Sequence, residues 1–194
     1  MNQRGLNRLA AAVVLPVVMG CQGGLHHEGE QRLTFMGSYG EPVSDGVAWK
    51  AGKGTGQNAA LTVGYDYFVK DRLALMVNGT PYRIYNQSDG DVYAGEFQIG
   101  LRYYICDFDV FDRPMAFYAE ALGGIMQGRR SVPETGHTFN FTQDTGVGFE
   151  WRIGENVSWI SGYRVKHLSD GDFFDDENPA QNDQFVYTGL AISW

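Results

Sequence analysis

Apolar and polar residues alternate along several segments of the chain, and this is the pattern of β-strands. Large apolar side chains recur at alternate positions within 61–69, 93–105 and 144–153, with Gly95 and Thr145 as the exceptions. The positions between them carry glycines, amides and charged residues, such as Arg102 and Glu150. Because successive side chains of a strand point to opposite faces, each segment predicts a strand with one apolar and one polar face.

The same pattern, followed through the chain, predicts an all-β fold of about eight antiparallel strands. Short turns at Lys70-Asp71 and Gly154-Glu155 contrast with long connections at 39–57, 128–137 and 170–183. Short turns at one end and long loops at the other are typical of bacterial outer-membrane barrels. The connection at 106–114 is long for a periplasmic turn, and the one at 86–91 is short for an external loop. The predicted strands are 31–38, 58–69, 72–85, 92–105, 115–127, 138–153, 156–169 and 184–194.

Alternation alone fits two kinds of barrel. A soluble lipocalin-like barrel turns its apolar face inward, whereas a transmembrane β-barrel turns it to the lipid and its polar face to the lumen. The aromatic weighting of the apolar face favours the membrane, where Tyr and Trp gather at the interfaces. The last residues, Leu190 to Trp194, alternate and close on an aromatic, which resembles the C-terminal signature of outer-membrane proteins. We therefore expect a transmembrane β-barrel in the bacterial outer membrane.

The first residues have the composition of a secretory signal segment. Arg4 and Arg8 precede an apolar run from Leu9 to Met19, which is too short to span a bilayer as a helix. The run Val18-Met19-Gly20-Cys21 loosely resembles a lipobox, so Cys21 is either a lipidated N-terminus or lies near an ordinary cleavage site. We assign 1–25 to the signal segment and 26–194 to the barrel domain.

Composition narrows the possible partners. The chain has 15 Lys and Arg against 23 Asp and Glu, a net charge of −8, and no basic run, which disfavours nucleic-acid binding. Its four histidines have no metal-ligand spacing, so we expect no metal or other cofactor. Arg129 and Arg130 fall in a predicted external loop, where they either contact lipid phosphates or only support a turn.

The half of the chain from about 117 to 194 resembles the lipid A 3-O-deacylase family. The resemblance rests on Tyr118 to Ala121, on Val132 to Gly136, and on the run from Phe139 to Thr142 with Gly146-Val147-Gly148. Its most specific part is a Tyr-Arg strand that ends in His167-Leu168-Ser169, followed by Asn178-Pro179 and the terminal aromatic. The resemblance implies an outer-membrane esterase that acts on lipid A of lipopolysaccharide without a cofactor.

The resemblance also implies roles for three residues: Ser169 is the nucleophile, His167 is the general base, and a glutamate orients the histidine. Counting back from the terminal Trp places Gln184 at the position of that glutamate. His167 and Ser169 are two residues apart, so both face the lipid at the outer end of their predicted strand. Without the resemblance, the same two residues also fit an interfacial histidine and a serine that begins a loop.

Two positions depart from the family pattern. Gln184 can hold an imidazole in one tautomer but brings no charge to stabilise imidazolium. Asp170 stands where the family has an asparagine after the serine, and a carboxylate there would oppose an oxyanion. The expected function is removal of an ester-linked acyl chain from lipid A. The alternatives are a non-catalytic outer-membrane barrel of the same family and a soluble lipocalin-like ligand-binding barrel; the oligomeric state stays open.

Overall fold

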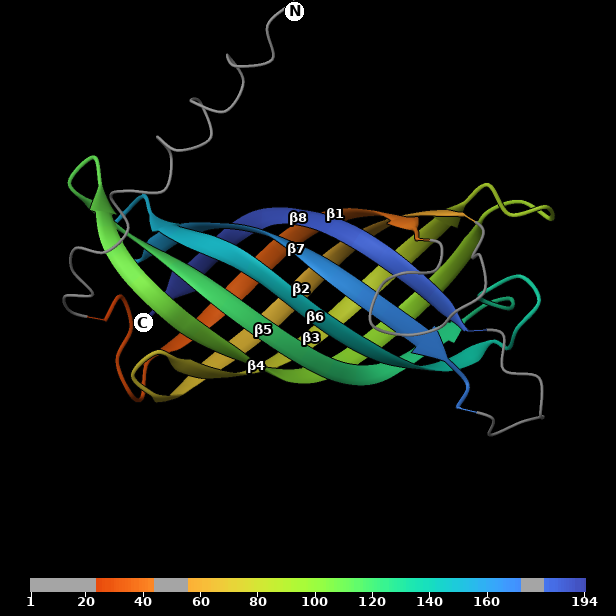
Figure 1. Ribbon diagram of the computed structural model, residues 1–194, viewed down its shortest axis with the longest axis horizontal. Coiled ribbons are helices and arrows are strands. Elements are labelled where there is room, and N and C mark those ends of the chain that lie inside the picture. The colour runs from red at the N-terminus through yellow and green to blue at the C-terminus, as the bar shows by residue number, and fades with distance from the viewer. Residues whose placement is uncertain (1–23, 44–55, 172–179) are drawn as a thin grey trace, which may run out of the picture.

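The computed structural model describes residues 24–43, 56–171 and 180–194, and within these ranges the chain forms one closed antiparallel barrel (Figure 1). The strands follow one another around the barrel in chain order, and the first pairs with the last. Because the barrel is closed, no strand edge has unpaired backbone groups. A lipid environment requires this, since it offers no water to hydrogen-bond such groups. The strands are β1 Gln31–Pro42, β2 Gln57–Lys70, β3 Leu73–Tyr85, β4 Val92–Val110, β5 Arg113–Gly128, β6 Phe139–Arg152, β7 Val157–Ser169 and β8 Gln181–Ser193.

The prediction of an eight-stranded antiparallel barrel is confirmed, and three of its connections need correction. The predicted loop 39–57 begins too early, because β1 continues to Pro42. The expected long link at 106–114 is wrong, because β4 and β5 stay paired up to Val110 and Arg113. Phe111 and Asp112 alone make the turn, with φ of 52° and 58°. The predicted loop 170–183 is too long at its C-terminal end, because β8 already begins at Gln181.

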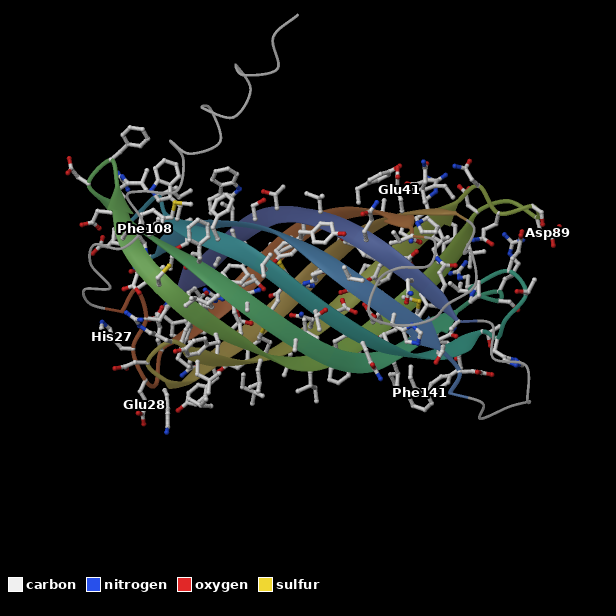
Figure 2. All side chains as sticks on the ribbon, viewed as in Figure 1. His27, Glu28, Glu41, Asp89, Phe108 and Phe141 are labelled. Carbon is white, nitrogen blue, oxygen red and sulfur yellow. The ribbon has the colours of Figure 1, made fainter. Side chains whose placement is uncertain are left out.

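The lengths of the connections orient the barrel. Both ends of the described barrel chain lie at one end of it, together with the tight turns at 71–72, 111–112 and 153–156. The longer connections, which include 86–91 and 129–138, lie at the other end (Figure 1). Outer-membrane barrels place short turns in the periplasm and long loops outside. In Figure 2, Asp89 and Glu41 therefore mark the outer end, and His27 and Glu28 mark the periplasmic end.

The outward face of the barrel is apolar over its whole middle. Leu61 is 68% exposed and Val186 is 61% exposed, although both are strand residues far from any turn. A soluble protein rarely exposes so large a contiguous apolar surface, whereas a lipid-facing barrel must. The side chains that project from the ribbon in Figure 2 form this face. Within the described ranges, no helix has the length and apolar character needed to cross a membrane.

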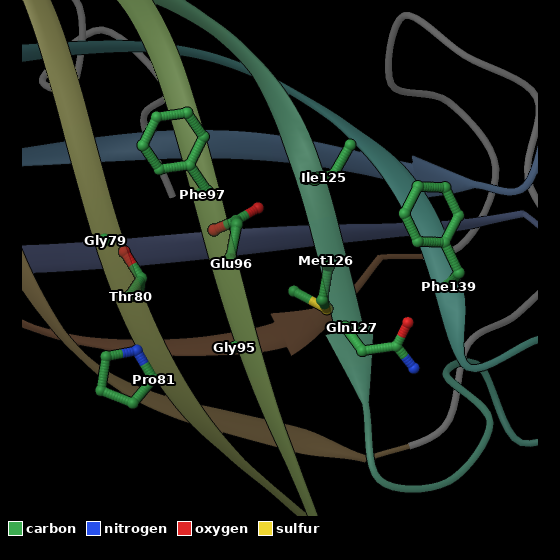
Figure 3. Close-up of a pocket in the computed structure, with 10 residues that line it drawn as sticks. All are labelled: Gly79, Thr80, Pro81, Gly95, Glu96, Phe97, Ile125, Met126, Gln127 and Phe139. Atoms are coloured by element: carbon green, nitrogen blue, oxygen red, sulfur yellow. The ribbon is translucent and has the colours of Figure 1, made fainter.

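A hollow interrupts this outward face on β3 and β4. Gly79 and Pro81 on β3 and Gly95 on β4 are neighbours in the strand register and present little or no side chain. Phe97, Gln127 and other residues of β4, β5 and β6 rise around them (Figure 3). The result is a groove of about 480 Å³, which we call the β3–β5 groove.

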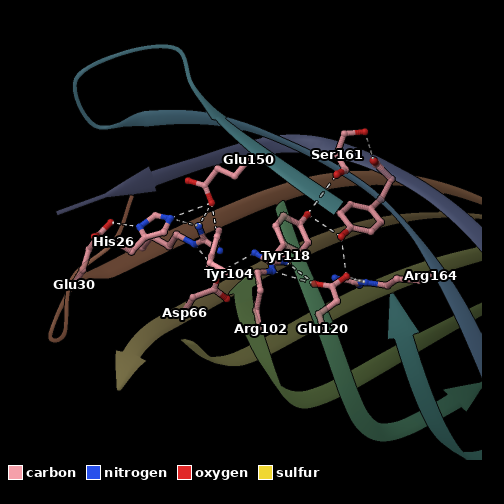
Figure 4. Close-up of polar contacts among 12 residues, drawn as sticks. His26, Glu30, Asp66, Arg102, Tyr104, Tyr118, Glu120, Glu150, Ser161 and Arg164 are labelled. Atoms are coloured by element: carbon pink, nitrogen blue, oxygen red, sulfur yellow. Dashed lines mark hydrogen bonds and ion pairs between the residues drawn. The ribbon is translucent and has the colours of Figure 1, made fainter. Parts of the chain in front are cut away.

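The lumen is filled by charged side chains that pair with one another. Asp66 accepts a hydrogen bond from Arg32 at 2.7 Å, and Glu120 accepts two from Arg102 at 3.0 and 2.8 Å. Arg164 also binds Glu120 (Figure 4). Buried charges are tolerated when each has a hydrogen-bonded partner. The interior is therefore a packed polar core, which explains the charged residues in the middle of the predicted strands.

We expect Glu120 to be important for stability, because two arginines and the Tyr187 hydroxyl all bind its carboxylate. Glu120→Gln would leave the buried guanidinium of Arg164 without its counter-charge and that of Arg102 with Asp66 alone, at 3.4 Å, at a cost of roughly 3 kcal/mol. Urea unfolding in phospholipid vesicles, followed by tryptophan fluorescence, measures the effect. The control is Glu155→Gln at an exposed periplasmic turn. An equal midpoint for both variants would contradict the assigned role of Glu120.

Residues ahead of β1 close the periplasmic mouth. His26 is 1% exposed, stacks on Phe68 with ring centroids 4.2 Å apart, and binds Glu30 through Nδ1 at 2.8 Å. Burial raises the pKa of Glu30, but the hydrogen bond and charge of His26 outweigh it and hold that pKa below its usual value. The predicted signal cleavage and the lipobox at Cys21 lie in 1–23, outside the described residues.

Candidate active site

The outer end of β7 brings His167 and Ser169 to the lipid-facing side of the barrel. Along β7 the odd-numbered positions face outward, as the 40% exposure of Tyr163 indicates. His167 is half-buried, and Ser169 is 9% exposed. The neighbouring strand β6 places Phe141 opposite Ser169. Since β7 runs from the periplasmic end to the outer end, the pair lies at the level of the outer leaflet.

Asn182 on β8 is the cross-strand partner of His167 and contacts its ring directly. The Nδ1 atom of His167 lies 2.7 Å from Oδ1 of Asn182. A carbonyl oxygen only accepts hydrogen bonds, so Nδ1 carries the proton and donates it. In this tautomer the lone pair is on Nε2, the nitrogen that can take a proton from a nucleophile. Asn182 therefore selects the tautomer that a general base requires.

The backbone around Ser169 supplies a donor close to its hydroxyl. The N–H of Gly171 donates to Ser169 Oγ at 3.3 Å. Gly171 has φ of +69°, in the left-handed region that favours glycine, and a Cβ there would approach the Phe141 ring at 3.6 Å. This turn lets the chain leave β7 while its N–H remains beside the serine oxygen. A backbone donor at this place can stabilise negative charge that develops during acyl transfer.

The carboxylate of Asp170 is engaged on the other side of the strand. Asp170 is 2% exposed, and its Oδ2 atom lies 3.3 Å from Nε2 of His137 in the β5–β6 connection. The sequence predicts that a carboxylate here would oppose an oxyanion. The His137 contact directs the charge toward the β5–β6 connection, which lessens that conflict.

Gln184 lies close to the pair but does not have the predicted contact with the His167 Nδ1 atom. It faces outward on β8 opposite Val165, one outward position farther toward the periplasm than Asn182. Its Oε1 atom accepts a hydrogen bond from the Tyr163 hydroxyl at 3.1 Å. Gln184 therefore lies on the same strand and face as Asn182, but Asn182 is the amide that contacts the His167 ring. Asn182 has the same outward parity, and this parity is the one signal in the sequence that could have found it.

The external connections hold one another through Arg130. This side chain donates to the carbonyls of Asp89 and Asp91, both at 2.6 Å, and so supports a turn rather than contacting lipid. The hydroxyl of Ser88 also donates to Glu134, and together with a backbone bond it keeps the pKa of the Glu134 carboxyl below its usual value. In the described residues, no group of three or more His, Cys, Asp or Glu is arranged to hold a metal.

Solved structures of outer-membrane proteins share this fold. Neisserial surface protein A matches with a TM-score of 0.58 and 16% identity, over 85% of this chain and 99% of its own. OprG of Pseudomonas aeruginosa matches with a TM-score of 0.54 and 10% identity, over 87% of this chain and 97% of its own. At these identities the likeness supports the fold alone. A search of curated protein sequences found no match.

A family profile covers most of the chain, including the candidate site. Residues 33–191 match the profile described as "Lipid A 3-O-deacylase (PagL)". The match begins in β1 and ends in β8, so it spans every strand of the barrel. It is far longer than the segment of resemblance that the sequence motifs indicate, which begins near residue 117.

Proposed function

The chain belongs to the lipid A 3-O-deacylase family, an outer-membrane barrel family, and on that premise we propose that it hydrolyses the ester-linked acyl chain at the 3-O position of lipid A. In this proposal Ser169 is the nucleophile, His167 is the general base, and Asn182 orients the histidine. The observation that carries it is the 2.7 Å contact between His167 Nδ1 and Asn182, on the strand and face where Ser169 follows two residues later.

The acylation step uses the three residues in a fixed order. Nε2 of His167 takes the proton of Ser169 Oγ as that oxygen attacks the ester carbonyl. The N–H of Gly171 lies 3.3 Å from Oγ and hence near the carbonyl carbon that Oγ attacks, where a backbone donor can stabilise the oxyanion of the tetrahedral intermediate. The imidazolium then returns its proton to the departing sugar oxygen. The products of this step are an acyl-serine and a lipid A with one free hydroxyl.

Deacylation repeats the proton transfers with water as the nucleophile. His167 removes a proton from water, the resulting hydroxide attacks the acyl-serine, and the fatty acid leaves as Ser169 regains its proton. Every proton in both steps passes through the same nitrogen, so the reaction needs no cofactor. The lipid-facing position of the pair suits an ester bond that lies between a sugar headgroup and its acyl chain.

The direct test is hydrolysis by the purified barrel. Protein folded in detergent is mixed with lipopolysaccharide, and both the released fatty acid and the remaining lipid A are measured by mass spectrometry. We expect one free hydroxy fatty acid and a lipid A lighter by that acyl chain. Release of no fatty acid by protein that migrates as a folded barrel on unboiled gels would refute the proposed activity.

A non-catalytic barrel of the same family is the second candidate. Gln184, where the resemblance implies a glutamate, and Asn182, beside His167, are both amides, and an amide gives imidazolium no charge stabilisation. If the wild-type chain binds lipid A without turnover, and Asn182→Asp gains turnover, the site has kept its geometry and lost its chemistry. That pair of results would favour this candidate over the first.

Substitutions at Asn182 and Gln184 distinguish the roles of the two amides. Asn182→Asp should raise turnover about tenfold, because a charge-assisted hydrogen bond to the imidazole is about twice as strong as a neutral one. Gln184→Glu should change turnover less than about twofold, since its partner is the Tyr163 hydroxyl. Initial rates of fatty-acid release measure both. A gain in Gln184→Glu with none in Asn182→Asp would return the orienting role to Gln184.

A further inference from the structure

The β3–β5 groove is a hollow in the lipid-facing surface, and two glycines create it. Cβ atoms built at Gly79 and Gly95 meet no atom within 4 Å, so these positions are open where other outward positions carry large side chains. Pro81 is the cross-strand neighbour of Gly95, and its short side chain forms the bottom of the groove. Phe97, 50% exposed, and Ile125, 44% exposed, form the wall toward the membrane centre (Figure 3). The groove has the shape of a slot for an apolar chain.

The volume of the β3–β5 groove is also that of a ligand-binding pocket. About 480 Å³ lies within the range of roughly 300–1,000 Å³ that small-molecule pockets have. The groove opens on a surface that faces hydrocarbon, where an acyl chain is the ligand at hand. A flat apolar strand surface offers such a chain contact on one side only, whereas a slot adds contacts on both flanks.

Two arginine side chains lie next to the groove, at its end nearest the external loops. The next outward pair of the register beyond Pro81 and Gly95 is Arg83 and Tyr93, which lie about 7 Å farther along the strands. The guanidinium of Arg129 lies 5.8 Å from the centre of the Tyr93 ring, and that of Arg83 lies 5.9 Å from it. We call Arg83, Tyr93 and Arg129 the arginine crown.

One of the two guanidinium groups has no acidic partner among the residues that the structure describes. Arg83 binds Asp91 through Nε at 2.9 Å and Nη2 at 2.6 Å, which offsets its charge. Arg129 is exposed, and in the described ranges no carboxylate lies within ion-pair distance of its side chain. A guanidinium at the headgroup level of the outer leaflet pairs well with phosphate, which it can bind through two parallel hydrogen bonds.

From the slot and the crown together we propose a second lipid site: the β3–β5 groove binds one acyl chain of a phosphorylated lipid A molecule, and Arg129 binds a phosphate of its headgroup. The glycines that form the groove are on β3 and β4, whereas the proposed catalytic pair is on β7. Phe139 of β6 lines the groove, and its ring lies 5.4 Å from that of Phe141, the cross-strand neighbour of Ser169. The inference rests on shape and charge alone and does not require Ser169 to be a nucleophile.

The test is photo-cross-linking with lipid A that carries a diazirine on an acyl chain. The Ser169→Ala protein in phosphatidylcholine nanodiscs is irradiated with this probe, digested with trypsin, and mapped by mass spectrometry. The Ser169→Ala background prevents hydrolysis of the probe, so the result does not depend on the proposed activity. We expect labelling concentrated in 73–83 and 84–102, with excess unlabelled lipid A competing it away.

Filling the slot provides the decisive variant. Gly79→Leu with Gly95→Leu should lower labelling of these peptides about tenfold, which is about 1.4 kcal/mol in binding. The matched control is Gly37→Leu on β1, another position where a Cβ meets nothing within 4 Å but which lies outside the groove. Labelling spread evenly around the barrel, or unchanged in the filled variant, would overturn the proposal. Cross-links between two copies of the chain through the groove would overturn it as well.

Removing the charge of Arg129 tests whether the arginine crown binds a phosphate. Arg129→Gln should lower labelling about tenfold, whereas Lys70→Gln, which removes one charge at the exposed periplasmic end of β2, should leave it unchanged. Dephosphorylated lipid A should compete at least about tenfold more weakly than the phosphorylated form. Equal competition by the two forms would remove the phosphate from the proposal, and inorganic phosphate that competes alone would show a free anion site in place of a lipid site.

Discussion

Ser169→Ala should abolish the release of fatty acid from lipopolysaccharide, with a loss of at least about 10⁴-fold. Without the hydroxyl no acyl-serine can form, and a water molecule at that place would not be held to the strand as the serine oxygen is. Residual activity of a site whose nucleophile is gone comes only from binding and oxyanion stabilisation. The measurement is the initial rate of fatty-acid release by the purified, folded variant.

A second serine on the same strand serves as the control. Ser161 lies on β7 with the same outward parity, and its hydroxyl donates to the Tyr187 carbonyl at 2.9 Å. Ser161→Ala should keep activity within about twofold, since this hydroxyl is far from His167 along the strand. Wild-type rates in Ser169→Ala would end the assignment of this serine as nucleophile, whatever Ser161→Ala does.

The barrel could be predicted from the sequence because its signals are local. Alternation is a property of neighbouring residues, so it predicts the two faces of each strand without reference to tertiary contacts. The lumen charges, such as Asp66 and Glu120, stand at alternate positions as the pattern requires. The turn at Phe111-Asp112 was missed because both residues adopt positive φ without a glycine to mark them, so the sequence reads as a longer loop.

The site could be predicted only as far as face and strand. Parity puts His167, Ser169, Asn182 and Gln184 on the outward face, but the register between β7 and β8 decides which amide meets the ring. That register is not set by a tight turn, because a long connection joins the two strands. A shift of the β7–β8 register by two residues would keep every side chain on its face, and it would place Gln184 opposite His167 in the position that Asn182 has. Pairing across the barrel, which the sequence does not encode locally, makes the choice.

Replacing His167 should be nearly as damaging as replacing the serine. His167→Ala should cost on the order of a thousand-fold or more in kcat, since a lost general base leaves the hydroxyl protonated at neutral pH. KM should change much less, because the acyl chain and the headgroup are held mainly by other contacts. Rates across a range of lipopolysaccharide concentrations separate these two quantities. A fall confined to KM would mean that His167 binds substrate and does not move protons.

Exogenous imidazole distinguishes a proton-transfer role from a structural one. His167→Ala leaves a space beside Asn182 at the lipid–water interface, and added imidazole can occupy it and accept the proton of Ser169. Activity of this variant should rise with imidazole concentration toward saturation. The Ser169→Ala protein should not respond, because it has no hydroxyl to activate. If imidazole restores nothing while His167→Gln keeps wild-type activity, the ring serves as a spacer between β7 and β8, and the general base is another group.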